Sequence, residues 1–314
     1  MELPDREAID WIVRTYAHLR AAHGEAIGDP ALVQPTSEYF PDPFPTDGAT
    51  LERLLQRVLS YAPVAADLRI ELAIQIAEEG HAGGCGSAAC GDGGGGGARD
   101  QATVEELDEG YRVSVAATDL GNPEVLTASL ARSAGLLVLH EAGEPVSVPE
   151  NEIAAVVCGF GVLLANGAAV WAKSCGGLRM AQATVLSVEE LALALALFAA
   201  TGEAGAGKAR KHLGATQREA FGLAWDWVES NPRLVEALRE APATLESGAL
   251  PLEPVRGVLG QWLHDRRARS LERSLRAGAA AAAAPPMTDE ERQRRLERQE
   301  RLREVSSLLD LPDR

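Results

Sequence analysis

The sequence has few aromatic residues, few cysteines and no long hydrophobic run. Aromatic residues make up only 4% of the 314 residues, so Leu, Val, Ile and Ala must build the core. The longest strongly apolar run, 191–200, has about half the length that a helix needs to cross a bilayer. The N-terminal stretch contains acidic residues and no apolar region of the kind found in secretory signals. We therefore expect a soluble cytoplasmic protein without a membrane span, whose four cysteines are reduced thiols.

Positive charge is also scarce. The chain has 30 Lys and Arg against 46 Asp and Glu, which gives a formal net charge of −16. An acidic surface repels the phosphate backbone, which dominates the affinity of proteins for nucleic acids. The Arg-rich stretch at 264–276 is typical of a solvated helix face. We therefore expect no nucleic-acid partner.

The patterning of apolar residues predicts an α+β fold that is mainly helical, with a small β element before a helical bundle. Alternating apolar and polar residues predict strands at 67–79 and 111–117, which flank a glycine-rich loop at 80–101. Helical periodicity accounts for the rest, including every segment after Pro123. Helices are expected at 5–23, after an N-cap at Asp47 or Thr50, and at 123–142, 150–171, 187–201, 208–230, 232–241 and 252–276.

The C-terminal part differs in composition from the remainder. Residues 1–276 are expected to form one mostly helical domain, and 277–286 an Ala/Pro linker. Residues 287–314 form a predicted charged helix, because Glu and Arg recur at helical spacing. Its last turns carry the apolar residues Val305, Leu308 and Leu309. We expect this C-terminal helix to dock on a protein partner or back on its own domain.

The stretch at 201–211 contains a fragment of a phosphate-binding loop. Gly202, Gly207 and Lys208 have the G-x-x-x-x-G-K spacing of a Walker A motif. That motif needs a Ser or Thr after the lysine to hold Mg²⁺, and here Ala209 follows. The segment before it is a predicted helix rather than a strand. We therefore expect a connector between two helices and no nucleotide site.

Three potential zinc ligands lie at the start of the glycine-rich loop. His81, Cys85 and Cys90 have the spacing H-x₃-C-x₄-C, and imidazole and thiolate are common zinc ligands. The spacing matches no standard zinc finger, and a fourth ligand would have to come from elsewhere. Two interpretations remain open, a zinc site or a loop with two incidental reduced cysteines.

His140 and Glu141 provide the first two positions of an H-E-x-x-H motif. Glu144 stands where the second histidine is required, so this helix alone does not place two imidazoles on one metal. A metal-dependent hydrolase would need folding to bring His140 and Glu141 together with Glu152. We keep that arrangement as an alternative.

Several segments together resemble an uncharacterised family of bacterial zincin-like proteins. That family has an aromatic and proline-rich segment, a strand, a helix with H-E-x-x-H, and a following helix that opens with an acidic residue. The resemblance extends over about residues 30–232 and has no counterpart in 233–314. The matching segments are 35–44, 122–143, 150–168, 186–202 and 218–232.

The resemblance implies a zincin-like scaffold that lacks the zinc chemistry. The family's H-E-x-x-H falls on "RSAGL", so its ligand and base positions are Arg132, Ser133 and Leu136 here. The third ligand falls on Glu152, which is still acidic. One carboxylate does not hold Zn²⁺, and a guanidinium repels a cation. We therefore expect a non-catalytic scaffold or interaction protein without a cofactor, the alternative being a zinc-binding protein or metal-dependent hydrolase.

Overall fold

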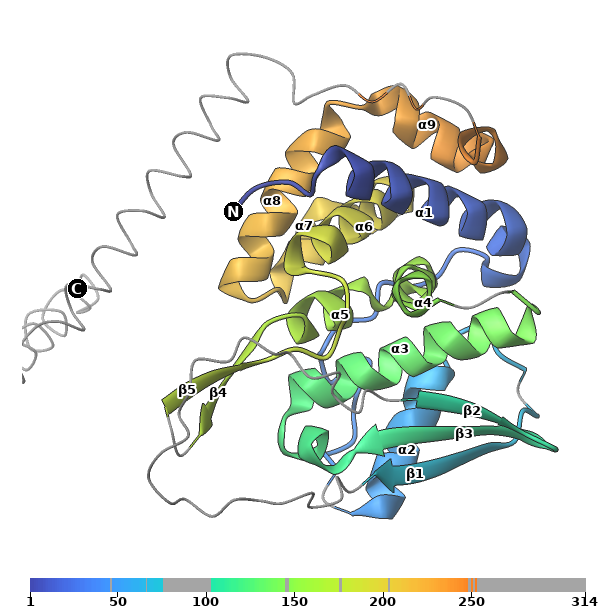
Figure 1. Ribbon diagram of the computed structural model, residues 1–314, viewed down its shortest axis with the longest axis vertical. Coiled ribbons are helices and arrows are strands. Elements are labelled where there is room, and N and C mark those ends of the chain that lie inside the picture. Colours follow the sequence, from blue (N-terminus) through green and yellow to red (C-terminus); the bar gives the residue numbers. More distant parts are fainter. Residues whose placement is uncertain are drawn as a thin grey trace, which may run out of the picture. The chain divides into compact units, whose positions relative to one another are not determined.

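The computed structural model describes residues 1–252 except 46, 66, 76–102, 145–146, 175–176, 203, 248–249 and 251, and only the backbone at 103, 172–174 and 177–180. All described residues belong to one compact unit, Met1–Gly257. Several predictions fall outside them, namely the glycine-rich loop with His81, Cys85 and Cys90, the helix at 252–276, the linker at 277–286 and the C-terminal helix at 287–314. Within the described part the fold is α+β and mainly helical, as the sequence predicts (Figure 1).

The β element is a three-stranded sheet. Strands β1 (Ile70–Gln75), β2 (Thr103–Leu107) and β3 (Gly110–Ala116) have the spatial order β1-β3-β2. The central strand β3 is parallel to β1 and antiparallel to β2. The predicted strands at 67–79 and 111–117 correspond to β1 and β3. Strand β2 is missing from the prediction because two adjacent glutamates interrupt its alternation.

One face of the sheet carries a row of exposed charges. Glu71, Arg112 and Glu105 are directly opposite one another on the three strands. The Arg112 guanidinium is 3.4 Å from a Glu71 oxygen and 3.2 Å from a Glu105 oxygen. Opposite charges facing each other across strands favour this register. Val113 and Val115 point to the other face and are fully buried.

Several helices begin where the sequence provides capping residues. Helix α1 (Arg6–Ile27) is capped by Asp5, whose carboxylate accepts a hydrogen bond from the Ala8 N–H. Helix α2 (Gly48–Leu59) begins after Asp47, one of the two predicted N-caps, which forms a capping box with Thr50. After the short 3₁₀ turn η1 (Ala117–Gly121), the Asn122 side chain caps helix α3 (Pro123–Glu141). These caps satisfy backbone N–H groups that have no partner within the helix.

The predicted helix at 150–171 is interrupted. The structure has α4 (Val148–Ala155), a π-helical turn η2 (Val156–Phe160) and α5 (Gly161–Gly167). Gly159 has a φ of +97°, and a Cβ there would overlap the Ala31 carbonyl oxygen. Its own carbonyl accepts a hydrogen bond of 3.0 Å from the Val33 N–H. Residues 31–33 cross the helix so closely at this point that only a glycine fits, which explains why the helix breaks there.

The stretch Val148–Gly167 is also apolar and long enough to span a membrane, but 83% of its most apolar window is buried in this fold.

The next segment corrects the expectation that only helices follow Pro123. Strands β4 (Val170–Ser174) and β5 (Gly177–Ala181) form an antiparallel hairpin. The exposed ring of Trp171 shows that this hairpin leaves an apolar side chain outside the core.

The apolar run of the sequence forms the centre of the bundle. Helix α6 (Val188–Thr201) packs against α1, α5, α8 (Ala215–Glu229) and α9 (Pro232–Glu240), and its residues from Leu191 to Ala200 are all buried. Its start is the predicted capping box, in which the Ser187 N–H donates to Glu190 over 2.7 Å. A last 3₁₀ turn, η3 (Pro242–Leu245), packs on α1.

The Walker-like stretch at 201–211 contains the end of α6, a short turn and a second helix, which starts before the predicted position 208. The Gly202 N–H ends α6 by donating to the Phe198 carbonyl, and α7 (Gly205–Lys211) begins at a glycine with a φ of +64°. The predicted single helix at 208–230 is wrong, because α7 ends at Lys211 and α8 starts at Ala215. The break is held by Asn166, whose side chain bonds both the His212 carbonyl and the Gly214 N–H.

Candidate functional site

Arg132 and Glu152 form an ion pair in the core between α3 and α4. The distance between the Arg132 Nε and the Glu152 Oε1 is 2.9 Å. Their side chains are only 3% and 0% exposed. Charged side chains are almost never buried to this extent unless they are paired. The two positions that the family resemblance assigns to metal ligands therefore lie in contact, and an ion pair occupies the space between them.

The ion pair also holds the segment that joins β5 to α6. The Glu152 carboxylate accepts hydrogen bonds from the Val185 N–H at 2.7 Å and the Leu186 N–H at 2.9 Å. The Arg132 guanidinium donates to the Ala183 carbonyl at 2.8 Å. We call these five residues the Arg–Glu cluster. It connects three separate parts of the chain through buried charge-assisted hydrogen bonds, which are stronger than neutral ones.

A glycine allows α3 and α4 to approach closely enough for the pair to form. A Cβ at Gly135 would overlap the Asn151 carbonyl oxygen and lie 2.7 Å from the Ala155 nitrogen. Gly135 is one turn after Arg132 on α3, and Asn151 is adjacent to Glu152. The sequence "RSAGL" therefore has a structural reason for its glycine, namely the crossing of the two helices.

Burial and pairing act in opposite directions on the two charges. Burial raises the pKa of Glu152, while the Arg132 guanidinium and the two backbone N–H groups lower it. Burial lowers the pKa of Arg132, while Glu152 and Asp119 raise it. Removing either partner would leave the other charge in the core without its counterion, which is strongly unfavourable.

The side chains of this cluster do not fit a zinc site. Arg132 is a donor-only cation, so it neither binds a metal nor leaves room for one beside Glu152. Ser133 is buried and donates its hydroxyl hydrogen to the Ser129 carbonyl over 3.1 Å. Leu136 offers no donor atom. The arrangement binds protein segments together, and neither Arg132 nor Leu136 supplies the imidazole that the zincin motif has at these positions.

The alternative metal site would need His140, Glu141 and Glu152 to meet. These side chains contact other residues instead. Glu141 accepts a hydrogen bond of 3.0 Å from the Tyr111 hydroxyl, and the rings of Tyr111 and His140 lie 5.7 Å apart. Glu152 pairs with Arg132 instead. Arg132 and His140 are eight residues apart on α3, which corresponds to about 12 Å along the helix.

The other sequence-predicted ligands lie in parts that the structure does not describe. His81, Cys85 and Cys90 are among the omitted residues, so their zinc interpretation stays a prediction. Among the described residues, no group of three His, Cys, Asp or Glu side chains is placed to hold a metal ion. Cys158 is buried in the π-helical turn, and burial raises its pKa to about 12. This thiol is therefore a core residue rather than a nucleophile.

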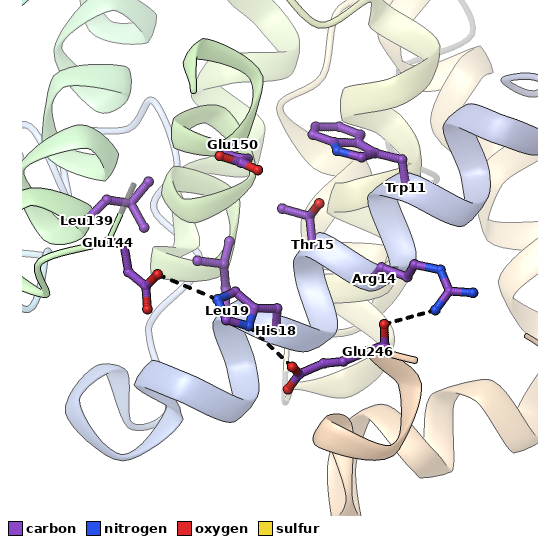
Figure 2. A pocket seen from close by; sticks show the side chains of 9 residues that line it. All are labelled: Trp11, Arg14, Thr15, His18, Leu19, Leu139, Glu144, Glu150 and Glu246. Atoms are coloured by element: carbon purple, nitrogen blue, oxygen red, sulfur yellow. Dashed lines mark hydrogen bonds and ion pairs between the residues drawn. The ribbon is translucent and has the colours of Figure 1, made fainter. Parts of the chain in front are cut away.

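A cavity of about 360 Å³ lies beside α1 (Figure 2). Figure 2 shows Trp11, Thr15 and His18 on α1 facing Glu144 and Glu150, with Glu246 below them. We call this cavity the α1 pocket. No motif in the sequence joins its residues, because they come from three distant parts of the chain, 11–19, 139–150 and 246.

Its polar groups are partly engaged with one another. The His18 ring nitrogens lie 3.5 Å from Glu246 and 3.8 Å from Glu144, as the dashed lines in Figure 2 show. His23 is 3.5 Å from the other oxygen of Glu144. The Arg14 guanidinium donates to the backbone carbonyl of Glu246 over 3.0 Å. These contacts hold the end of η3 and the end of α3 on α1.

Comparison with protein-family models, with curated proteins and with solved structures finds no match to this chain.

Proposed function

We propose that this chain is a non-catalytic cytoplasmic scaffold or protein-interaction protein, built on a degenerate zincin-like architecture. Its predicted C-terminal helix at 287–314 carries the contact with a protein partner. The observation that supports the proposal most is the 2.9 Å ion pair between Arg132 and Glu152. In the family that the sequence resembles, these positions bind zinc.

The ion pair supports the two parts of the proposal, the zincin-like architecture and the non-catalytic role. A metal site would require the residue at 132 on α3 and the residue at 152 on α4 to face each other, and they do. The residues at these positions also remove the chemistry, because a guanidinium replaces an imidazole and Ser133 replaces the general base. What remains is a rigid joint between α3, α4 and the segment before α6.

The resemblance can be tested by rebuilding the family's motif. The variant combines Arg132→His, Ser133→Glu and Leu136→His and keeps Glu152. Residues 132 and 136 are four apart on α3, so both imidazoles would face one metal. We expect the purified variant to bind about one Zn²⁺ per chain, measured by atomic emission after dialysis.

A matched control keeps the three substitutions and adds Glu152→Gln, which is expected to weaken zinc binding. Circular dichroism of both variants verifies that they fold. Folded protein that takes up no zinc in the rebuilt variant would contradict the zincin-like assignment. For the unmodified chain, a stoichiometric zinc that is lost on Cys85→Ser would instead support the alternative zinc site with His81 and Cys90.

The partner contact is tested separately. Val305, Leu308 and Leu309 are replaced together by serine in the full-length chain, and co-purification from cells is compared with the unmodified protein. We expect the partner to be lost, because these residues are the apolar end of the predicted charged helix. Replacing Glu297, Glu300 and Glu304 by glutamine serves as a control on the charged part of the same helix. Unchanged association of the serine variant would contradict the proposal.

A further inference from the structure

A second cavity shares Trp11 with the α1 pocket. It has a volume of about 380 Å³ and is lined by Asp5, Glu7 and Ala8 on one side and by Pro149, Leu186 and Glu190 on the other. Trp11 is common to both cavities. One indole therefore lies between two neighbouring hollows on the same part of the surface.

Both cavities are strongly acidic. Glu144, Glu150 and Glu246 line the α1 pocket, and Asp5, Glu7 and Glu190 line the second cavity. Arg14 is the single Lys or Arg among the described residues that line either one. Six carboxylates against one guanidinium create a local negative potential around Trp11, on a chain that is acidic overall.

Three of the carboxylates are fixed in place by helix N-termini. Asp5 accepts from the Ala8 N–H, and Glu150 and Glu190 accept from the N–H groups of Ser147 and Ser187. Each of these bonds uses one carboxylate oxygen. Since an ionised carboxylate has two oxygens that both accept, the second one can still receive a donor. These side chains are therefore held in position before any partner arrives, which lowers the entropy lost on binding.

The helix N-termini partly offset the charge of these three carboxylates. Glu7, in the first turn of α1, and Glu246, at the end of η3, take part in no such cap, so no capping hydrogen bond occupies their carboxylate oxygens. Glu7 is exposed, and Glu246 lies beside His18. Each of the two cavities thus keeps at least one uncapped carboxylate.

The indole adds a preference for organic cations over metal ions. A guanidinium or ammonium group over the face of a tryptophan is attracted by the ring, and tryptophan is the best aromatic residue for this. The floor of the α1 pocket is apolar, with Leu19 and Leu139 both buried. Such a surface accommodates the methylene stem of Lys or Arg as well as its charged end.

We propose that the surface around Trp11 binds a protein segment that presents two Arg or Lys side chains, one to each cavity. The inference rests on the proposed function, because it names the chemistry of a partner of an interaction protein. It concerns a different surface from the C-terminal helix, so the two can fail separately. Charge complementarity and the shared indole select a basic peptide.

Binding of a basic peptide to the surface around Trp11 can be measured by fluorescence anisotropy. A labelled ten-residue peptide that contains four arginines is added to the protein at low salt. The site variant is Glu7→Gln with Glu246→Gln, which removes one uncapped carboxylate from each cavity. We expect about fivefold weaker binding, the effect of losing two exposed charge pairs. Trp11→Ala should weaken binding about threefold by loss of the cation–π contact.

The control variant, Glu25→Gln with Glu52→Gln, has the same net charge but changes exposed residues away from both cavities. It should bind the peptide like the unmodified protein, and a peptide with glutamine in place of arginine should not bind. Equal weakening in the site and control variants would overturn the proposal, since attraction would then come from overall charge. Absence of binding to the unmodified protein would overturn it too, without affecting the test of residues 305–309.

Discussion

Two arginines of this protein hold carboxylates in very different surroundings. Arg132 pairs with Glu152 in the core, where the two side chains are 3% and 0% exposed. Arg112 lies between Glu71 and Glu105 on the sheet, where the three side chains are 39%, 40% and 64% exposed. The distances are similar, since all lie between 2.9 and 3.4 Å.

The surroundings decide what each pair does. In water, the attraction between two charges is weak and the side chains lose freedom when they pair, so exposed pairs contribute little. In the core, bulk water does not solvate either charge, so each charge is stabilised mainly by its partner. Arg112 favours the register of the strands, whereas Arg132 and Glu152 connect α3, α4 and the segment before α6.

Glu152→Ala tests this difference with the largest expected effect. The substitution leaves the Arg132 guanidinium buried and also removes the acceptor for the N–H groups of Val185 and Leu186. We expect the free energy of unfolding to fall by about 5 kcal/mol, at the upper end for a broken buried pair. Urea unfolding measures it, with Glu71→Ala on the sheet as the matched control. Similar losses in the two variants would remove the distinction between the regions.

Arg132→Met should have a smaller but still large effect. The substitution leaves the Glu152 carboxylate buried, but its two backbone hydrogen bonds remain, so we expect a loss of about 3 kcal/mol in unfolding free energy. The double variant with Glu152→Met should lose clearly less than the sum of the two single Met variants, because neither charge is then left alone. Strict additivity in this double-mutant cycle would show that the two side chains do not interact.

Gly135→Ala tests the helix crossing on which the pair depends. A methyl group there overlaps the Asn151 carbonyl, so α3 and α4 must separate, and we expect a loss of about 2 kcal/mol. Gly207→Ala in α7 is the control, because a Cβ at Gly207 meets nothing within 4 Å. Alanine is the better helix former, so the control should be unchanged or slightly more stable. Thermal unfolding of both variants measures the difference, and an equally tolerant Gly135 would contradict the close crossing.

Local chemistry made much of the fold predictable from the sequence. Asp47 and Ser187 indicate helix starts because their side chains accept hydrogen bonds from the free N–H groups of the first turn. The structure has a capping box at both positions. The mainly helical α+β class follows from the same periodicity. The break at Gly159 was not predictable, because it depends on the distant carbonyl of Ala31. Strands β2, β4 and β5 were missed because each has only 5 residues, too few to show a clear alternation.

The candidate site was less accessible from the sequence. Resemblance to a family pointed to Arg132 and Glu152, but their contact depends on the crossing at Gly135. The N–H groups of Val185 and Leu186 carry no side-chain signal at all, although they hold Glu152 in place. The acidic surface around Trp11 combines residues that are far apart in the chain. Sequence patterns show which residues share an element, whereas these sites depend on how the elements pack.

Arg112→Met, the same substitution as at Arg132, should have the smallest effect. Because the pairs with Glu71 and Glu105 are exposed, we expect a loss of less than about 1 kcal/mol in unfolding free energy. Salt sharpens the comparison, since surface charges more than about 3 Å apart are largely screened at 1 M. The destabilisation by Arg112→Met should therefore shrink when urea unfolding is repeated in 1 M NaCl, while that by Arg132→Met should persist. If both variants respond equally to salt, solvent reaches Arg132, and the Arg–Glu cluster is not the closed joint that its burial indicates.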